Sequence, residues 1–276
     1  MRCLRRSRSF AYTDLSGIVV ETLAGARSRA SALVSRATLS FASLVLGCDR
    51  NRSSAMTVDI RLYALVDPEH AGGRDLAELS RLVAQGGATL VQLRDKRSDT
   101  RPMVQLARAI KAALAPFKIP LLVNDRVDVA LASGADGVHV GQQDMAVEDA
   151  RRLLGPGAII GLSIKTVAQA EAAPLDLLDY VGVGGVFATS SKDNPNPPIG
   201  PGGLARIADV FRQRAAPSFP LCGIAGIDAS NAGEAVGAGA DGVAVISALS
   251  LQADPQAAAR ALRAVVDAAL AQRQRR

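Results

Sequence analysis

The sequence predicts an α/β protein folded as a closed (β/α)8 barrel, a TIM barrel, in a single domain. Three observations predict this fold. Short apolar segments alternate with helical segments eight times between residues 62 and 272, no segment of another kind interrupts them, and Gly-Ala-Asp-Gly-Val occurs twice, at 134–138 and 239–243. Neighbouring parallel strands need helical crossovers, so the alternation favours a barrel. A doubly wound sheet is the alternative, but no G-x-G-x-x-G opens a helix after a strand.

The expected elements follow one another in a regular order. The strands are expected at residues 62–66, 89–96, 120–125, 137–141, 158–164, 180–187, 220–224 and 242–246. The helices are expected at residues 76–85, 102–114, 127–132, 147–154, 167–172, 204–214, 231–236 and 255–272. Leu76, Leu79 and Leu82 recur at helical spacing, and Gly86 and Gly87 end that first helix. In the repeated phrase, glycine at the helix end and before the strand permits a tight reversal.

The first 55 residues differ in composition from the rest of the chain. They hold nine arginines and three acidic residues, a net charge of +6, which equals the net charge of the whole chain. The predicted barrel domain, residues 56–276, therefore carries 23 basic and 23 acidic residues, so no nucleic-acid partner is expected. The basic extension is expected to be a disordered tail, an organelle transit peptide, or translated sequence upstream of a true start at Met56, which we favour.

The positions of the cysteines and the hydropathy of the sequence predict the cellular compartment. Cys3 and Cys48 lie in the extension and Cys222 in an apolar strand, so there is no disulfide framework and no paired metal-ligand spacing. No segment reaches the roughly 20 apolar residues that a membrane helix requires. We therefore expect a cytoplasmic protein without a membrane partner. The sequence leaves the oligomeric state open, a homo-oligomer included.

The second expected strand carries polar residues at every second position, Gln92, Arg94 and Lys96. Alternate side chains of a strand point to opposite faces, and the outer face of a barrel strand packs against helices. This row is therefore expected at the interior or at the C-terminal mouth of the barrel. Two cations there need an anion. A solvated edge strand is the alternative explanation.

The other expected strands also end in polar residues. In a barrel of this type the chemistry lies at the C-terminal ends of the strands. The residues at these ends are Gln92, Arg94, Lys96, Asn124, Asp125, Gln142, Asp144, Ser163, Lys165, Thr189, Ser190, Ser191, Lys192, Gly226, Ile246 and Ser247. We therefore expect the functional site at this end of the barrel.

Two aspartates follow adjacent expected strands, Asp125 after the third and Asp144 after the fourth. Their carboxylates are expected at the same rim. Hard oxygen ligands with no His or Cys beside them suit Mg2+, which completes its shell with water and phosphate oxygens. Each aspartate also precedes an expected helix, so helix capping is an alternative role for either one.

Three further positions have a candidate role at this end. The backbone N–H groups near Gly226 and at Ile246–Ser247 follow the seventh and eighth strands, where barrels commonly bind a phosphate. Lys192 opens a Pro-rich loop, and a lid that carries this lysine into the site is favoured over a solvated loop. His139 lies in mid-strand, and a satisfied core histidine is favoured over a catalytic one.

Residues 61 to about 270 resemble the thiamine phosphate synthase family. The matching phrases are Gln92–Lys96, Asn124–Asp125, 135–144, 161–163, 180–184, Thr189–Lys192 and 242–247, which cover nearly every repeat after the first. The resemblance implies a transferase of thiamine biosynthesis with Mg2+ as cofactor. It would join a pyrimidine diphosphate to a thiazole phosphate and release diphosphate.

The resemblance also implies roles for single residues. For the pyrimidine diphosphate it implies binding by Gln92, Leu93, Arg94, Asp95, Lys96, Asn124, Ser163 and Lys192, of which Arg94, Lys96, Lys192 and Ser163 are catalytic. For the thiazole phosphate it implies Thr189, Ser190, Ser191, Gly226, Ile246 and Ser247. For Mg2+ it implies Asp125 and Asp144.

The chain departs from the family pattern at three places. It has Lys165 where the family usually has His, Ala188 where it has Pro, and Ala225 where it has Gly. Lys165 adds a cation near the expected site, and its role is left open. Two other functions are alternatives: a thiazole tautomerase-like barrel, which would need a general acid or base and no metal pair, and a non-catalytic phosphate-ligand binding protein.

Overall fold

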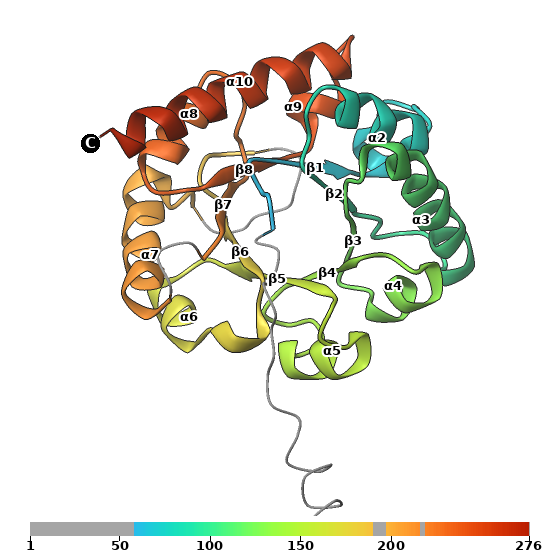
Figure 1. Cartoon of the computed structure of the whole chain (residues 1–276), viewed down its shortest axis with the longest axis horizontal. Helices are drawn as coiled ribbons and strands as arrows, with labels where there is room; N and C mark the ends of the chain where they lie inside the picture. Colours follow the sequence, from blue (N-terminus) through green and yellow to red (C-terminus); the bar gives the residue numbers. More distant parts are fainter. Residues whose placement is uncertain (1–57, 190–196, 216–218, 276) are drawn as a thin grey trace, which may run out of the picture. The chain divides into compact units, whose positions relative to one another are not determined.

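The computed structural model describes residues 58–189, 197–215 and 219–275. Within these residues, eight parallel strands pair in chain order and β1 closes the barrel against β8, with Leu62 opposite Val243. Figure 1 shows the barrel end-on, with the helices outside the ring of strands. The predicted (β/α)8 fold is confirmed. The expected division at residues 55 and 56 falls outside the described residues.

The strands are short and their bounds lie close to the expected ones. They are β1 (Leu62–Val66), β2 (Leu90–Leu93), β3 (Leu121–Asn124), β4 (Gly137–Val140), β5 (Ile159–Ile164), β6 (Tyr180–Gly184), β7 (Leu221–Ile224) and β8 (Gly242–Val245). Two strands, β2 and β6, are shorter than the predicted ranges 89–96 and 180–187. Arg94 still donates its N–H to the Val66 carbonyl, 2.9 Å away, but the chain then turns away from β1.

The helices agree with expectation except that α7 begins four residues earlier and one short helix is added. They are α2 (Leu76–Gln85), α3 (Thr100–Leu114), α4 (Val127–Ser133), α5 (Val147–Leu154), α6 (Val167–Ala172), α7 (Gly200–Arg214), α8 (Ala232–Gly237), α9 (Ser247–Ser250) and α10 (Pro255–Gln274). Single 3-10 turns lie at η1 (Pro68–His70), η2 (Ala115–Phe117) and η3 (Leu175–Leu177). The unexpected α9 follows β8 directly. No helix in the described ranges is long and apolar enough to cross a bilayer.

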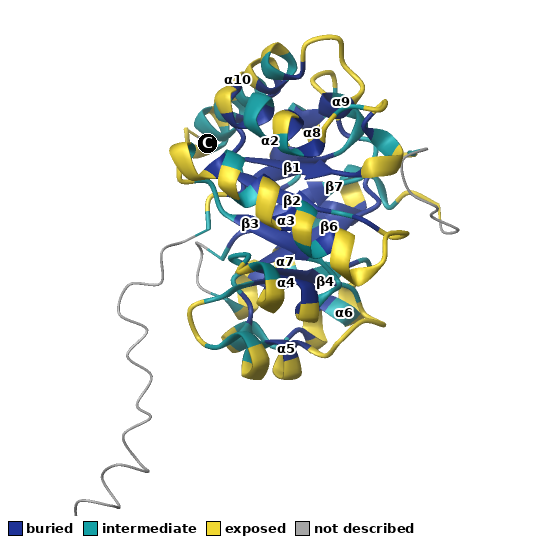
Figure 2. Ribbon diagram, turned by 90° about the vertical axis from the view of Figure 1, so that its right-hand side faces the viewer, coloured by how far each residue is buried: buried dark blue, intermediate teal, exposed yellow. Residues whose placement is uncertain are grey.

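The core has two layers because strand side chains alternate between the two faces of the barrel wall. The outer layer fills the space between strands and helices, and Figure 2 shows the buried strands between helices whose outer faces are exposed. The inner layer lies inside the barrel and consists of Ile60, Tyr63, Leu65, Leu90, Leu122, Tyr180, Cys222 and Ala244. Apolar residues thus fill the lower part of the barrel, below the polar strand ends.

The repeated Gly-Ala-Asp-Gly-Val phrase forms the same turn twice. The carboxylates of Asp136 and Asp241 accept the backbone N–H of Leu121 (2.9 Å) and Leu221 (3.1 Å), at the start of the strand before each turn. A Cβ on Gly137 would lie 1.8 Å from a carbonyl oxygen of the next strand, so glycine is required at this crossing. These turns fix the lower end of the barrel.

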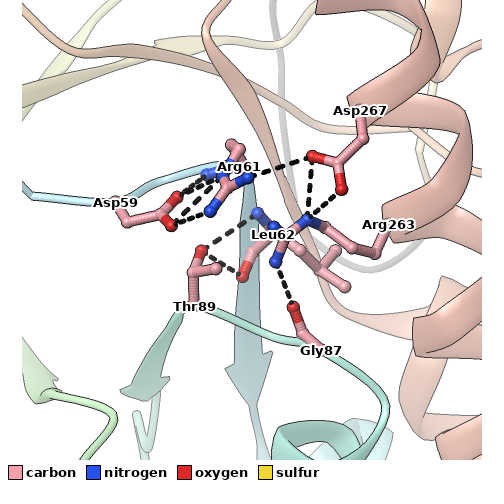
Figure 3. A network of polar contacts seen from close by, with 7 residues as sticks. All are labelled: Asp59, Arg61, Leu62, Gly87, Thr89, Arg263 and Asp267. Atoms are coloured by element: carbon pink, nitrogen blue, oxygen red, sulfur yellow. Dashed lines mark hydrogen bonds and ion pairs between the residues drawn. The ribbon is translucent and has the colours of Figure 1, made fainter.

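A polar network joins α10 to the lower end of β1 and β2 (Figure 3). Arg61 forms an ion pair with Asp59 and reaches Asp267 of α10 at 3.4 Å. Arg263, one turn before Asp267, holds the same carboxylate at 2.9 Å and donates to the Gly87 carbonyl, also at 2.9 Å. The last helix is therefore attached where the first strand closes the barrel.

Candidate functional site

A cavity of about 450 Å3 opens at the carboxyl ends of the strands. Among the predicted site residues, those that line it are Gln92, Arg94, Asn124, Ser163, Thr189, Gly226, Ile246 and Ser247. These residues come from the ends of β2, β3, β5, β6, β7 and β8. The structure thus brings together side chains that are up to 155 residues apart in sequence, as the barrel topology predicts.

Arg94 lies at the edge of this cavity and is oriented by Asp67. The Asp67 carboxylate is only 1% exposed, forms an ion pair with the Arg94 guanidinium, and accepts the Glu69 N–H at 2.9 Å. A guanidinium has five N–H donors, so this pair holds the group in place while other donors face the cavity. Asp67 was missed by the sequence analysis. The signal was available, since Asp67 directly follows the first strand.

Lys96, Asp125 and Asp144 form a second charged group at the same rim. The Lys96 ammonium contacts the Asp125 carboxylate, and Asp144 accepts the Gly141 N–H at 2.8 Å. Asp125 has a left-handed backbone with φ of 61°, and its N–H donates to the His139 carbonyl at 2.8 Å. Adjacent strands three and four therefore place both aspartates together, as expected. None of the three side chains lines the main cavity.

The pKa of Asp125 reflects its burial and the two charged neighbours, Lys96 and Asp144. Burial raises the pKa of Asp125, Lys96 lowers it, and the neighbouring Asp144 carboxylate raises it, so that the net shift is upward. Two carboxylates crowded in this way are stabilised by a divalent cation. Among the described residues no cluster of three or more His, Cys, Asp or Glu exists. A carboxylate pair fits Mg2+, which takes one or two protein carboxylates and fills its shell with water and phosphate.

The loop after β7 has two consecutive residues with a left-handed backbone. Ala225 has φ of 83° and Gly226 has φ of 64°. A Cβ on Gly226 would lie 2.2 Å from the Ala188 carbonyl oxygen, so this position admits only glycine. The Asn231 side chain donates to the Gly226 carbonyl at 2.8 Å and holds the loop against the start of α8.

The buried polar residues below the rim are connected to one another. His139, 8% exposed, lies 2.9 Å from the Ser163 hydroxyl through Nε2 and 2.8 Å from the Tyr180 hydroxyl through Nδ1. The sequence analysis favoured a satisfied core histidine, and this histidine is both hydrogen-bonded and part of the cavity lining. Burial raises the pKa of the nearby Cys222 thiol to about 12, so it is not a nucleophile at neutral pH.

Several predicted site residues do not line the cavity or cannot be placed. The Leu93 side chain is fully buried in the outer core layer, away from the cavity. The Asp95 carboxylate accepts the backbone N–H groups of Arg97 and Ser98 and shapes the loop after β2. Ser190, Ser191 and Lys192 lie outside the described residues. Their roles, like that of Asp95, stay predictions.

Lys165 lines a second, smaller cavity of about 40 Å3. It shares Ser163 and Thr189 with the main cavity, so the two adjoin. The backbone N–H of Lys165 donates to the Gln169 side chain at 2.7 Å, in the capping box that starts α6. Lys165 therefore lies beside the main cavity, as expected from the sequence.

Comparison with known proteins identifies the family. A family model described as "Thiamine monophosphate synthase" matches residues 62–249, which span all eight strands. The chain belongs to the thiamine monophosphate synthase family. A thiamine-phosphate synthase of Agrobacterium fabrum is 48% identical over 217 residues, which cover 79% of this chain and 98% of that protein. One of Albidiferax ferrireducens is 47% identical and covers 76% of this chain and 93% of that protein.

A solved structure supports the same family assignment. The thiamine phosphate pyrophosphorylase from Pyrococcus furiosus superposes with a TM-score of 0.68 at 34% sequence identity, covering 78% of this chain and 99% of that one. The predicted resemblance to the thiamine monophosphate synthase family is therefore confirmed. So is the prediction that the chain is an enzyme of the transferase class.

Proposed function

We propose that the chain joins 4-amino-2-methyl-5-(diphosphooxymethyl)pyrimidine to 4-methyl-5-(2-phosphoethyl)thiazole, giving thiamine phosphate and diphosphate. One observation carries the proposal: two cations and two carboxylates share the carboxyl end of a barrel beside a cavity of about 450 Å3. A cavity of this size suits a small-molecule substrate. The family to which the chain belongs supports the choice of reaction.

The reaction is a dissociative substitution. The bond between the methylene carbon of the pyrimidine and the diphosphate oxygen breaks, and its electron pair leaves with the diphosphate. The amino group of the ring stabilises the carbon cation, and the lone pair of the thiazole nitrogen then forms the new carbon–nitrogen bond. Because this nitrogen carries no proton, no general base is needed.

The protein's task is to stabilise the departing diphosphate. Arg94 is held by a buried carboxylate at the cavity, and Lys96 lies at the rim, so both can meet negative charge as it accumulates. Preorganised charge of this kind is usually the largest catalytic contribution, and the loss of one cation should cost roughly 10²–10³ in rate. Lys192 is proposed as a third cation from the family resemblance alone.

Asp125 and Asp144 would hold Mg2+. A bound Mg2+ would supply positive charge to the leaving diphosphate. The Lys96 ammonium contacts the Asp125 carboxylate, so this cation lies beside the two carboxylates that would hold the metal.

The test is the release of diphosphate by the full chain supplied with both substrates and Mg2+. Asp125→Asn should abolish Mg2+-dependent turnover and leave binding of the thiazole phosphate, measured by calorimetry, nearly intact. Asp209→Asn is the control, because Asp209 lies on the outer side of α7 and is 62% exposed. Unchanged turnover in Asp125→Asn refutes the metal site. Binding of the thiazole phosphate without diphosphate release by the wild type favours a tautomerase or a binding protein.

Two further properties stay proposals of the same kind. We propose a cytoplasmic location, because the pattern of cysteines suits a reducing compartment. Assembly into a homo-oligomer is compatible with the family and is decided by measuring the mass in solution.

A further inference from the structure

Five side chains from five strands form one continuous hydrogen-bond chain inside the barrel. In order they are Gln92 (β2), Tyr63 (β1), Tyr180 (β6), His139 (β4) and Ser163 (β5). The Gln92 amide nitrogen donates to the Tyr63 hydroxyl, and the two tyrosine hydroxyls lie 2.8 Å apart. Tyr180 then meets Nδ1 of His139 at 2.8 Å, and Nε2 of His139 meets the Ser163 hydroxyl at 2.9 Å.

The barrel is shaped to hold this chain. Tyr63 is 1% exposed, Tyr180 is fully buried, and their rings meet edge to face with centroids 5.7 Å apart. A Cβ on Gly161 would lie 2.1 Å from the Tyr180 ring, so glycine is needed to make room for it. Burial raises the pKa of both tyrosines, which keeps each hydroxyl protonated with a single hydrogen to donate.

Counting hydrogens gives the chain one direction. The Gln92 amide nitrogen can only donate, so the Tyr63 oxygen accepts. Among the described residues, the remaining partner for the Tyr63 hydrogen is the Tyr180 oxygen, so we infer that Tyr63 donates to Tyr180. Tyr180 must then donate to Nδ1 of His139. A neutral imidazole that accepts at Nδ1 carries its hydrogen on Nε2, which donates to the Ser163 oxygen. The Ser163 hydrogen is thereby directed away from His139.

Both ends of the chain meet the cavity. Gln92 and Ser163 line it, as do Tyr63 and His139 between them, whereas Tyr180 does not. Gln92 is 1% exposed, and its carbonyl oxygen Oε1 is buried without a hydrogen-bond partner among the described residues. An unpaired buried oxygen is unfavourable, so it favours a ligand that donates a hydrogen bond to it. The Ser163 hydroxyl offers the opposite pattern, a donor.

We propose that Tyr63, Tyr180 and His139 are positioning residues that fix the hydrogen-bond polarity of the cavity, with Gln92 as acceptor and Ser163 as donor. A 4-aminopyrimidine has a donor, its amino group, beside an acceptor, its ring nitrogen. The 4-oxo analogue has the reverse, an acceptor beside an N–H donor. The Gln92 acceptor therefore fits the amino group and rejects the oxygen of the oxo ring. The choice of ligand in this inference rests on the proposed function. The direction of the hydrogen bonds does not depend on that function.

The direction of the hydrogen bonds can be measured through His139 by NMR, because the protein has only two histidines. The full-length protein is labelled with [15N]histidine, and His70→Gln removes the second signal. In the ligand-free protein His139 is expected as the single tautomer with hydrogen on Nε2. Hydrogen on Nδ1, or a mixture of the two tautomers, overturns the proposal. This spectrum needs no activity, so it stands even if no diphosphate is released.

The selectivity is tested with Tyr180→Phe, which keeps the ring and removes one link. Calorimetry compares the 4-amino pyrimidine diphosphate with its 4-oxo analogue. The wild type should prefer the amino ring by about 10- to 100-fold, which corresponds to one mismatched buried hydrogen bond. Tyr180→Phe should lose most of this preference and the single tautomer of His139. A folded Tyr180→Phe protein that keeps both overturns the proposal.

Leu90→Val is the matched control. Leu90 is fully buried in the same inner layer, contributes no hydrogen bond to the chain, and does not line the cavity. This variant should lose stability but keep the tautomer and the ring preference. If Leu90→Val changes the ring preference as much as Tyr180→Phe does, packing rather than polarity sets the selectivity, and the proposal fails.

Discussion

Single residues after β7 show how closely the backbone approaches the cavity. Gly226 and Ala225 are both left-handed, but Ala225 already carries a Cβ, whereas a Cβ on Gly226 would clash with the backbone of residues 187 and 188. A methyl group at Gly226 must displace that segment, which leads to Thr189 in the cavity wall. The space for a Cβ, rather than φ alone, therefore determines which of the two residues can change.

The first prediction compares the two positions. Gly226→Ala should weaken thiazole phosphate binding at least tenfold and lower the free energy of unfolding by about 1–3 kcal/mol, because both backbone strain and a clash are introduced. Ala225→Gly should bind normally, since it relieves a left-handed alanine. Calorimetry and urea unfolding measure the two effects. Equal behaviour of the two variants would show that the loop adapts freely.

The second prediction concerns Asp95 and pH. Burial raises the pKa of Asp95, but hydrogen bonds from Ser98 and Arg97 outweigh it and leave the pKa below the ordinary 3.8. The Asp95 carboxylate therefore binds a proton less readily in the folded state than in the unfolded state. This difference stabilises the folded state above the ordinary pKa of 3.8. The stabilisation is lost as the pH falls through the lower pKa of the folded state. Asp95→Asn should be less stable than wild type at neutral pH, and this difference should vanish in acid. Urea unfolding across pH checks it; a constant difference contradicts the prediction.

Sequence reasoning identified residues at strand ends better than it identified the residues that hold those side chains in place. Gln92, Arg94, Asn124 and Ser163 line the cavity because strand alternation and barrel topology determine where a strand end points. Asp67 was missed although it directly follows the first strand, because its partner, Arg94, is 27 residues away and no local pattern links the two. The roles of Leu93 and Asp95 came from family resemblance, and the residues alone did not indicate them.

Among the elements, the fold was predictable wherever periodicity was long enough to read. The predicted second strand ends three residues too late. Arg94 and Lys96 continue the alternation of polar residues after the pairing of β2 with β1 has ended at Leu93. The helix α9 was missed because four residues, Ser247–Ser250, are too few to show a helical period. Both errors fall at the carboxyl ends of strands, where the chain leaves regular structure to build the site.

The third prediction tests how the last helix is attached. Arg263→Ala removes an ion pair with Asp267 and a hydrogen bond to the Gly87 carbonyl, which together link α10 to the barrel floor (Figure 3). The free energy of unfolding should fall by about 1–2 kcal/mol. Arg212→Ala is the control, because among the described residues Arg212 forms its ion pair with Asp209 of its own helix, and its loss should cost less than about 0.5 kcal/mol. Equal losses would show that the contact between elements adds nothing.

In the whole molecule, the excess positive charge and the described barrel come from different parts of the sequence. Residues 1–55 carry a net charge of +6, and the barrel domain has equal numbers of basic and acidic residues. All eight strands and the whole lining of the cavity come from residues 60 onward, with β1 already paired to β8 from Leu62. Within the described residues, the pairing that closes the barrel begins at Leu62.

The last prediction is that a chain starting at Met56 keeps both activity and stability. Its turnover and midpoint of thermal unfolding should equal those of the full chain, because every described contact of the site and of the core is retained. Its retention on a cation-exchange column should fall sharply, because the excess positive charge is removed with the extension. The unchanged chain is the reference in each measurement. If turnover or the unfolding midpoint drops, residues 1–55 take part in the fold, and the boundary at Met56 is wrong.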